Sequence, residues 1–362
     1  MLNMARALGA TGHEAAVVTS RVPGLPEVDS SEAFGPVFRL YDRGEAGSSR
    51  VLDTVLSVVR DVRPDIIEGA DHLGDCARLL GVSHRPPILI KVHSCSALNV
   101  LRDSQVYVWW QKLTIAAAML RNRRLDVRER FCIEHADFLC VPTRRLRDEL
   151  KKQGLRLPGN VEVIPNPMIP PAPAASKEAE RPTVLFVGRI DIGKGIQYLP
   201  AMVSSLLRHR PDAVLEIAGE DTYARGIGSL GAWLERRLAD FSGSVRFLGK
   251  LTRPELESAY RRAWVVVLPS RWDNFPTVVL EAMGYAKPVV GSPHGGMPEM
   301  LEGTRGVIAD PASAEFPLRV AELLADESLR SAVGASMRQK LERSYSPAVV
   351  VAKYLKFLGA GR

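Results

Sequence analysis

The chain has 362 residues, which is enough for two domains that each bury a core of their own. Its composition, with 46% hydrophobic and 25% charged residues, excludes a fibrous or disordered chain and is typical of a globular protein. The formal net charge of +7 favours partners that carry negative charge, such as an acidic substrate, an acidic membrane surface or nucleic acid.

Helices and strands are predicted to alternate through the first half of the chain, as in α/β proteins with parallel sheets. The predicted helices are Leu2–Leu8, Val51–Val62, Cys76–Leu80 and a longer one from about 107 to 135. The predicted strands are Ala15–Ser20, Asp65–Glu68, Ile88–Val92 and Phe138–Val141. His93 directly follows a strong strand, so it is expected at the carboxyl edge of the sheet, either as a structural histidine or facing a ligand.

Met1 falls inside the first predicted helix. A Rossmann-like domain normally opens with a strand and a tight loop, and in the usual strand order that strand is central. We therefore expect either that the natural chain starts further upstream, which we prefer, or that the domain lacks its first strand and its sheet is cut in the middle.

The segment 166–182 (NPMIPPAPAASKEAERP) is rich in proline and has little periodicity, which predicts a stiff, extended linker. A second alternation of strands and helices follows, with predicted strands at Thr183–Val187, Val214–Ala218, Val245–Leu248, Trp264–Leu268, Pro288–Gly291 and Gly306–Ile308. The simplest architecture is two Rossmann-like domains, residues 1–165 and 183–345, whose ligands bind at the carboxyl ends of the strands, in the cleft between the domains. A last helix at about 346–360 is expected to pack back on the first domain.

Two carboxylates, Asp273 and Glu281, stand eight positions apart in the segment Asp273–Met283 (DNFPTVVLEAM). Asn274 is a good N-cap and Pro276 is close to the favoured first helical position, so a helix is predicted to begin here, after a buried strand. The free N–H groups and the positive dipole end of such a helix form an anion site. Glu281 then either accepts hydrogen bonds from ligand hydroxyls or is one solvated residue of a capped core helix.

The run Gly188–Gly195 (GRIDIGKG) follows a predicted strand and matches the G-x-x-x-x-G-K part of a phosphate-binding loop. Gly195 stands where such a loop needs Ser or Thr to hold Mg²⁺, which argues against an NTPase. What remains is a flexible loop whose Arg189 and Lys194 suit a diphosphate, unless both are solvated surface charges.

Other glycine-containing turns also follow predicted strands. The run Ser292–Glu299 (SPHGGMPE) is a strand-to-helix turn that is either structural or a ligand contact. Gly219 and Gly249 end strands beside the expected cleft. These features therefore predict one site. The second domain contributes cationic side chains, a helix N-terminus and a carboxylate, and the first domain contributes His93.

The sequence shows no targeting signal: no apolar run reaches the length of a transmembrane helix, and the first residues lack the pattern of a signal peptide. The four cysteines have no C-x-x-C spacing and are expected to be reduced. We therefore expect a cytoplasmic protein. The arginines between 121 and 130 are interpreted as a solvated helix face, with peripheral contact to an acidic membrane or to an acceptor as the alternative.

Taken in order, the motifs resemble those of the family-4 retaining glycosyltransferases, which have the GT-B fold. The matching segments, in addition to His93, are GHEAAVVTS (12–20), PDIIEGAD (64–71), EHADFLCVPT (134–143), VIPNP (163–167), FVGRIDIGKG (186–195), IAGED (217–221), FLGK (247–250) and PSRWDNFPTVVLEAMGYAKPVVGSPHGGMPEML (269–301). Each short motif is weak alone, but their shared order through nearly the whole chain is specific.

The resemblance implies a nucleotide-sugar donor held mainly by the second domain, with no metal ion or other cofactor. Arg189 and Lys194 would grip the diphosphate and stabilise the leaving group. Glu281 would bind the ribose, and Asp273 the hydroxyls of the donor sugar. The other implied donor contacts are Gly188 in the loop, Gly219 and Gly249 at the base and ribose, Asn274, Phe275, Pro276 and Thr277 at the sugar and phosphate, and His93 from the first domain. The expected catalytic residues among them are His93, Arg189, Lys194 and Asp273.

The resemblance also implies transfer with retention, by front-face attack within an ion pair, to a glycan, a lipid or a small natural product, and no nucleic-acid partner. The sequence departs from the family pattern in two places. The family usually has Glu where this chain has the shorter Asp273, which leaves the donor sugar open. The first strand and its Gly-rich loop are also missing, so the alternative is a catalytically silent relative that binds a nucleotide sugar or a partner. A phosphorylase or a sugar-nucleotide epimerase is a third possibility.

Overall fold

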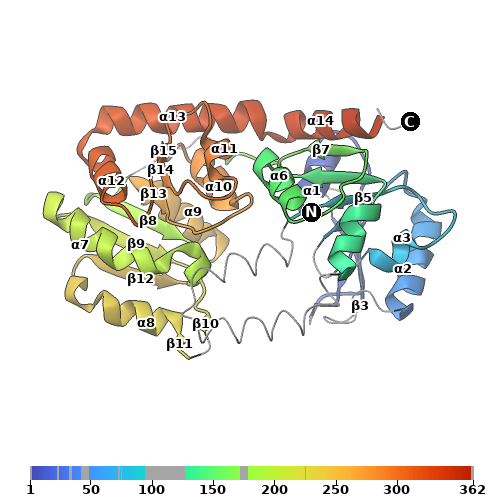
Figure 1. The fold of residues 1–362 in the computed structure, drawn as a ribbon, viewed down its shortest axis with the longest axis horizontal. Coiled ribbons are helices and arrows are strands. Elements are labelled where there is room, and N and C mark those ends of the chain that lie inside the picture. The colour runs from blue at the N-terminus through green and yellow to red at the C-terminus, as the bar shows by residue number, and fades with distance from the viewer. Residues whose placement is uncertain are drawn as a thin grey trace. The chain divides into compact units, whose positions relative to one another are not determined.

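The computed structural model describes residues 2–22, 24–31, 35–41, 49–71, 74, 76–93, 127–171, 178–224 and 226–359. The chain forms two compact units (Figure 1). Unit 1 comprises residues 1–169 and 346–362, and unit 2 comprises residues 170–345. The chain thus returns to unit 1 for its last helix.

Unit 1 is an α/β unit. Its helices are α1 (Leu2–Ala10), α2 (Ser49–Val62), α3 (Ala77–Leu80), a helical segment over 127–135, α6 (Arg144–Lys152) and α14 (Pro347–Gly359). Its strands are β1 (Val17–Ser20), β2 (Val28–Ser31), β3 (Gly35–Tyr41), β4 (Ile67–Ala70), β5 (Ile88–Lys91), β6 (Phe138–Val141) and β7 (Val161–Val163).

The described strands of unit 1 form two separate sheets. One has the order β1-β3-β2 and the other has the order β4-β5-β6-β7. Helix α1 packs on both, because Met4 and Ala7 join the core cluster of the four-stranded sheet whereas Ala5 packs with Val17 and Val37 of the three-stranded one. Apolar residues of α2 likewise cover the four-stranded sheet, and α2 also contacts β3. The two sheets are therefore linked through helices rather than through strand pairing.

Unit 2 is a second α/β unit. Its principal strands are β8 (Thr183–Val187), β9 (Val214–Ala218), β12 (Val245–Gly249), β13 (Val265–Leu268), β14 (Val289–Gly291) and β15 (Val307–Ile308). A small hairpin is formed by β10 (Tyr223–Ala224) and β11 (Gly228–Ser229). The helices are α7 (Leu199–His209), α8 (Leu230–Arg237), α9 (Arg253–Arg262), α10 (Thr277–Gly284), α11 (Met297–Leu301), α12 (Glu315–Ala325) and α13 (Glu327–Ser344).

The six principal strands of unit 2 form one parallel sheet in the order β12-β9-β8-β13-β14-β15. Its central strands are buried along their length, as expected for continuous apolar runs covered by helices on both faces. The chain winds from β8 outward through β9 to β12, and then from β13 outward through β14 to β15. The strand order therefore reverses between β8 and β13, which is where open α/β sheets bind ligands.

The second described end of the predicted linker, from Glu178 on, is attached to unit 2. Glu178 forms ion pairs with Lys287 at 3.3 Å and with Arg330 at 3.1 Å. The indole Nε1 of Trp264 donates a hydrogen bond to the carbonyl oxygen of Ala179. The segment around Glu178, which lies in the predicted stiff linker of residues 166–182, thus packs on unit 2.

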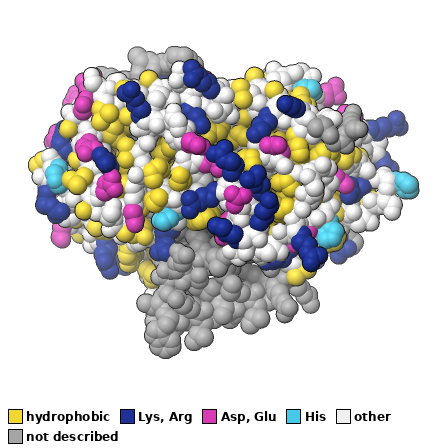
Figure 2. All heavy atoms as spheres, turned by 45° about the horizontal axis from the view of Figure 1, so that its top comes forward, with side chains coloured by type: hydrophobic (Ala, Val, Ile, Leu, Met, Phe, Trp, Pro, Cys, Tyr) yellow, Lys and Arg dark blue, Asp and Glu magenta, His cyan; other side chains and the backbone are white. Residues whose placement is uncertain are grey.

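The basic residues do not form one continuous surface on the face shown in Figure 2, where Lys and Arg side chains lie among Asp and Glu side chains. Of the arginine cluster between 121 and 130, only Arg128 and Arg130 belong to the part that the structure describes. Arg128 is exposed, and Arg130 bonds to the carbonyl oxygen of Gln153. Within the described residues, no helix is both long and apolar enough to cross a membrane.

Candidate functional site

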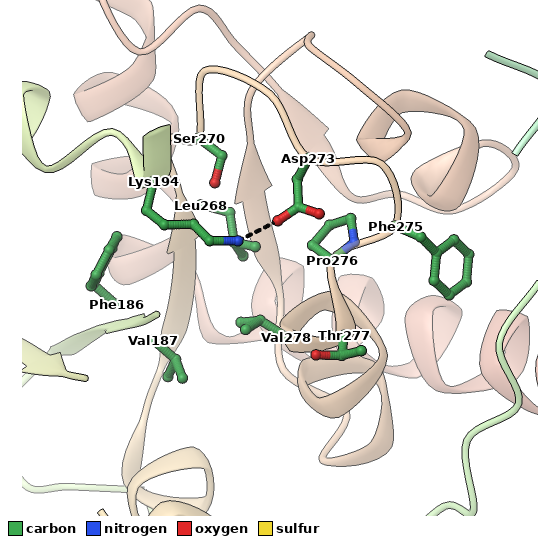
Figure 3. Close-up of a pocket in the computed structure, with 10 residues that line it drawn as sticks. All are labelled: Phe186, Val187, Lys194, Leu268, Ser270, Asp273, Phe275, Pro276, Thr277 and Val278. Atoms are coloured by element: carbon green, nitrogen blue, oxygen red, sulfur yellow. Dashed lines mark hydrogen bonds and ion pairs between the residues drawn. The ribbon is translucent and has the colours of Figure 1, made fainter. Parts of the chain in front are cut away.

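A cavity of about 160 Å³ lies in unit 2 where the strand order reverses. It is lined by Phe186, Val187, Lys194, Leu268, Ser270, Asp273, Phe275, Pro276, Thr277 and Val278 (Figure 3). The residues come from the ends of β8 and β13, from the loops that follow these two strands and from the start of α10. Five of the predicted site residues therefore meet here: Lys194, Asp273, Phe275, Pro276 and Thr277.

The loop after β8 is held firmly around Lys194. The carboxylate of Asp191 accepts a hydrogen bond from the backbone N–H of Lys194 at 3.0 Å. Gly195 has a left-handed backbone with φ +82°, and a Cβ at this position would overlap the carbonyl group of Pro269. Glycine thus lets the loop press against the chain that leaves β13, which places Lys194 beside that segment.

Lys194 and Asp273 form an ion pair across the cavity. Their Nζ and Oδ2 atoms are 2.5 Å apart, and their side chains are 29% and 16% exposed. The two side chains point toward each other, one from the loop after β8 and one from the loop after β13 (Figure 3). A cation suited to phosphate and a carboxylate suited to hydroxyl groups are therefore adjacent, and each neutralises the other while no ligand is bound.

The glycine turn after β14 supports the backbone of Asp273. The N–H of Gly296 donates a hydrogen bond to the carbonyl oxygen of Asp273 at 2.7 Å. Gly295 has φ +68°, and a Cβ there would overlap the backbone of Asp273. The turn thus has a structural role, because it sets the position of the Asp273 backbone, while a ligand contact at this turn stays a prediction.

Helix α10 begins later than the sequence predicted. The residue before the helix is Pro276, and no side chain caps the first turn, which starts at Thr277. The prediction that Asn274 is the N-cap is wrong, since its Oδ1 accepts a hydrogen bond from Nε1 of Trp272 at 2.7 Å. The helix N-terminus thus opens onto the cavity without a side-chain cap, as an anion site requires.

The ring of Phe275 points away from Lys194 and Asp273 (Figure 3). It is 7% exposed and packs edge-on against Tyr345, with 5.7 Å between ring centroids. Phe275 thus anchors the loop between β13 and α10.

Glu281 lies outside the cavity lining and is largely buried. Its Oε2 accepts a hydrogen bond from the hydroxyl of Tyr260 on α9 at 2.6 Å. Burial raises the pKa of Glu281, and the hydrogen bond from Tyr260 acts against that rise. The carboxylate is thus a bonded, buried group, which differs from the solvated residue of the alternative reading.

The remaining predicted residues of unit 2 are not part of the cavity lining. Arg189 is 60% exposed and pairs with Asp191 at 3.0 Å, and Gly188 precedes it at the end of β8. Gly219 and Gly249 are neighbours, because the N–H of Gly219 donates a hydrogen bond to the carbonyl oxygen of Gly249 at 2.8 Å. These residues lie at the ends of β8, β9 and β12, and so at the carboxyl edge of the sheet.

His93 belongs to unit 1, where it follows β5. Its backbone N–H donates a hydrogen bond to Oδ1 of Asp71 at 2.8 Å. Burial lowers the pKa of His93 to about 4, and nearby positive charge, including that of Lys91, adds to the shift. The imidazole is therefore neutral at pH 7.

Two polar residues of this region, Ser270 and Tyr260, were not predicted from the sequence. Ser270 lines the cavity, and its backbone carbonyl accepts a hydrogen bond from the hydroxyl of Ser292 at 2.6 Å. Tyr260 contacts Glu281 from 21 positions away, and no local pattern could have indicated that contact. Across the described ranges, no group of three or more His, Cys, Asp or Glu side chains could hold a metal ion.

Comparison with known proteins assigns both halves of the chain. A family model described as "Glycosyl transferase 4-like domain" matches residues 1–167, and one described as "Glycosyl transferases group 1" matches residues 181–326. The chain is 31% identical to a sulfoquinovosyl transferase of Arabidopsis thaliana over 46% of its own length and 31% of that protein. It is 27% identical to an alpha-D-kanosaminyltransferase of Streptomyces kanamyceticus over 70% of its own length and 64% of that protein. The chain thus spans between about a third and two thirds of these relatives.

Two solved structures show the same fold along almost the whole chain. Sucrose-phosphate synthase from Thermosynechococcus elongatus has a TM-score of 0.78 at 21% identity, covering 99% of this chain and 92% of that one. HepE from Anabaena, solved with UDP and glucose, has a TM-score of 0.69 at 16% identity, covering 99% of this chain and 95% of that one. With both halves matched in order, the chain belongs to the group 1 glycosyltransferases and has their GT-B fold.

Proposed function

We propose that this protein transfers a sugar from a nucleotide-sugar donor to a hydroxyl group of a glycan, a lipid or a small natural product. The observation that carries the proposal is the Lys194–Asp273 pair beside the uncapped N-terminus of α10, at the point where the strand order reverses. The site offers positive charge for a diphosphate and a carboxylate for sugar hydroxyls within one cavity. The solved complex of HepE with UDP and glucose supports a donor of this class.

In the proposed complex, the diphosphate lies between Lys194 and the first N–H groups of α10 near Thr277, with Arg189 reaching it from the loop. Asp273 binds the hydroxyls of the sugar, and Glu281 binds the ribose. The base lies over Gly219 and Gly249. As the bond between the sugar and the diphosphate breaks, Lys194 and the helix dipole stabilise the negative charge of the leaving group, which needs no metal ion.

We also propose retention of configuration at the anomeric carbon. The acceptor oxygen attacks from the face that the diphosphate leaves, and the acceptor proton passes to the departing phosphate oxygen. Because the attack takes place within an ion pair of the sugar cation and the diphosphate, a covalent carboxylate intermediate is not required. His93, neutral at pH 7, is proposed to contact the donor from unit 1.

The proposal is tested by incubating the protein with a panel of nucleotide sugars and measuring release of the nucleoside diphosphate. With the active nucleotide sugar thus identified, Lys194→Ala should lower the rate of sugar transfer about 100-fold or more. The variant lacks the ammonium group that stabilises the developing negative charge of the leaving diphosphate. Lys152→Ala is the matched control, since it removes an exposed lysine paired with Glu149 in unit 1.

Near-normal turnover of a folded Lys194→Ala protein would contradict the diphosphate role. Binding of a nucleotide sugar without release or transfer would instead favour the catalytically silent relative. Analysis of the product separates transfer from phosphorolysis and from epimerisation.

A further inference from the structure

Tyr260 is a buried tyrosine whose hydroxyl donates a hydrogen bond to the carboxylate of Glu281. The tyrosine belongs to α9 and is 1% exposed, and its hydroxyl lies 2.6 Å from Oε2 of Glu281. Its ring stacks on that of Tyr285, with centroids 5.3 Å apart and an angle of 10° between the planes. Packing thus fixes the tyrosine, and the tyrosine in turn fixes the carboxylate.

The two oxygens of Glu281 are in different situations. Oε2 accepts the bond from Tyr260. No described group donates to Oε1, and Oε1 is not among the polar atoms that are both buried and without a partner. One oxygen is therefore occupied by the protein, while the other remains open to a ligand.

The tyrosine hydroxyl can act only as a donor to this carboxylate. Burial and the adjacent carboxylate of Glu281 raise the pKa of Tyr260 well above its usual value, so the proton stays on the tyrosine at any physiological pH. Burial also raises the pKa of Glu281, and the hydrogen bond from Tyr260 works in the opposite direction. Tyr260 thus favours the charged form of Glu281, which is the better acceptor for a hydroxyl group.

We infer that Tyr260 is a positioning residue that holds Glu281 with one oxygen directed to the ribose hydroxyls of the donor nucleotide. The inference rests on the proposed function, in which Glu281 binds the ribose. Tyr260 itself does not touch the ligand. Tyr260 therefore affects the preference for ribose over deoxyribose more than it affects the binding of the diphosphate.

The test is Tyr260→Phe, which keeps the stacked ring and removes only the hydroxyl. Calorimetry measures the dissociation constants of UDP, 2′-deoxy-UDP and 3′-deoxy-UDP for the full chain. We expect the wild type to prefer UDP over at least one deoxy analogue by about tenfold or more, as for a hydrogen bond to a charged group. In Tyr260→Phe that ratio should fall to within about threefold of unity.

Tyr354→Phe is the matched control. It also removes a hydrogen bond from a buried tyrosine to a glutamate, Glu68, but in unit 1. For Tyr354→Phe, the ratio of the dissociation constants of the deoxy analogue and UDP should equal that of the wild type. Glu281→Asp provides a second variant, because it withdraws the carboxylate from Tyr260 by one methylene and leaves the tyrosine in place. Glu281→Asp should also lose the preference for UDP over the deoxy analogue. It therefore provides a test if Tyr260→Phe does not fold.

The possible outcomes distinguish a failure of the positioning role from a failure of the proposed function. If the wild type binds no nucleoside diphosphate or nucleotide sugar, the proposed function fails. If the wild type distinguishes ribose from deoxyribose and Tyr260→Phe keeps the same ratio while folded, the positioning role is overturned and the function stands. A wild type that binds UDP without any such preference also overturns the inference.

Discussion

The ion pair between Lys194 and Asp273 joins two functional groups that are 79 positions apart in sequence. The sequence analysis identified both residues, each from its own motif and from the family resemblance. It did not predict that they contact each other, because contact depends on how the loops after β8 and β13 meet. It also assigned Asp273 to the donor sugar alone. In the structure, Asp273 also forms an ion pair with Lys194, the lysine of the proposed diphosphate site.

This coupling predicts opposite effects of Asp273→Asn on two measurements. Binding of UDP should tighten about fivefold, because Lys194 no longer has to leave a partly buried ion pair worth about 1 kcal/mol. Sugar transfer from the active donor should fall at least about tenfold, because a charged acceptor for the sugar hydroxyls is lost. Calorimetry and a transfer assay measure the two effects.

Asp148→Asn, which removes an exposed ion pair with Arg147 in unit 1, should change neither quantity. Weaker binding of UDP to Asp273→Asn would show that Asp273 supports Lys194 rather than competing with the phosphate.

Elements of unit 2 were predicted more closely than those of unit 1, for a physical reason. Strands β8 and β9 have the predicted bounds, since buried parallel strands are continuous apolar runs with clear ends. Strands β2 and β3 were missed. β2 is mostly exposed and reads VDSS, while β3 begins with Gly-Pro and carries an arginine, so neither has a strong strand pattern. Strand β3 pairs with both β1 and β2, and this pairing determines the structure of β2 and β3.

The glycine turn after β14 gives a prediction for this element. Gly295→Ala should lower the free energy of unfolding by more than about 2 kcal/mol, since it combines a left-handed backbone with overlap against Asp273. Gly303→Ala is the control, because Gly303 also has a left-handed backbone, with φ +74°, but has open space around it. This variant should lower the free energy of unfolding by only about 1 kcal/mol. Chemical unfolding monitored by tryptophan fluorescence measures both.

Equal losses for the two variants would mean that the loop of Asp273 shifts to accommodate the methyl group. Transfer activity, measured on the folded fraction, would then reveal whether Asp273 has moved.

At the level of the molecule, unfolding should respond to acid through His93. Its pKa is about 4 in the native state and 6.5 in an unfolded chain, so below pH 6.5 the unfolded state binds a proton that the native state does not. Stability is therefore lost as the pH falls from 6.5 to 4, by up to about 1.4 kcal/mol per pH unit. Above pH 6.5 the histidine contributes no pH dependence.

Scanning calorimetry from pH 7 to pH 4 on the wild type, His93→Gln and His13→Gln measures this effect. Because the chain has two units, more than one unfolding transition is expected. Only the transition of unit 1 should show the pH dependence caused by His93. His93→Gln should flatten its pH dependence, whereas His13→Gln, which changes an exposed histidine, should not. Identical slopes for all three proteins would contradict the assignment.

The fold class followed from the alternation of elements and from the motif order, and the comparisons confirm it. The described strands of unit 1 form two sheets, whereas the sequence alone did not indicate the three-stranded one. How α1 spans both sheets could not be predicted, because it depends on packing between residues far apart in sequence, such as Ala7 and Val351.

The division of the sheet in unit 1 has a consequence for cooperativity. No strand pairing joins β1-β3-β2 to β4-β5-β6-β7 among the described strands, so their cohesion depends on side chains of α1 and α2. Local opening of α1 can then release the three-stranded sheet while the four-stranded sheet keeps its backbone hydrogen bonds. We therefore expect two units of local unfolding within unit 1, with the amide hydrogens of β1 and β3 exchanging with solvent earlier than those of β5 and β6.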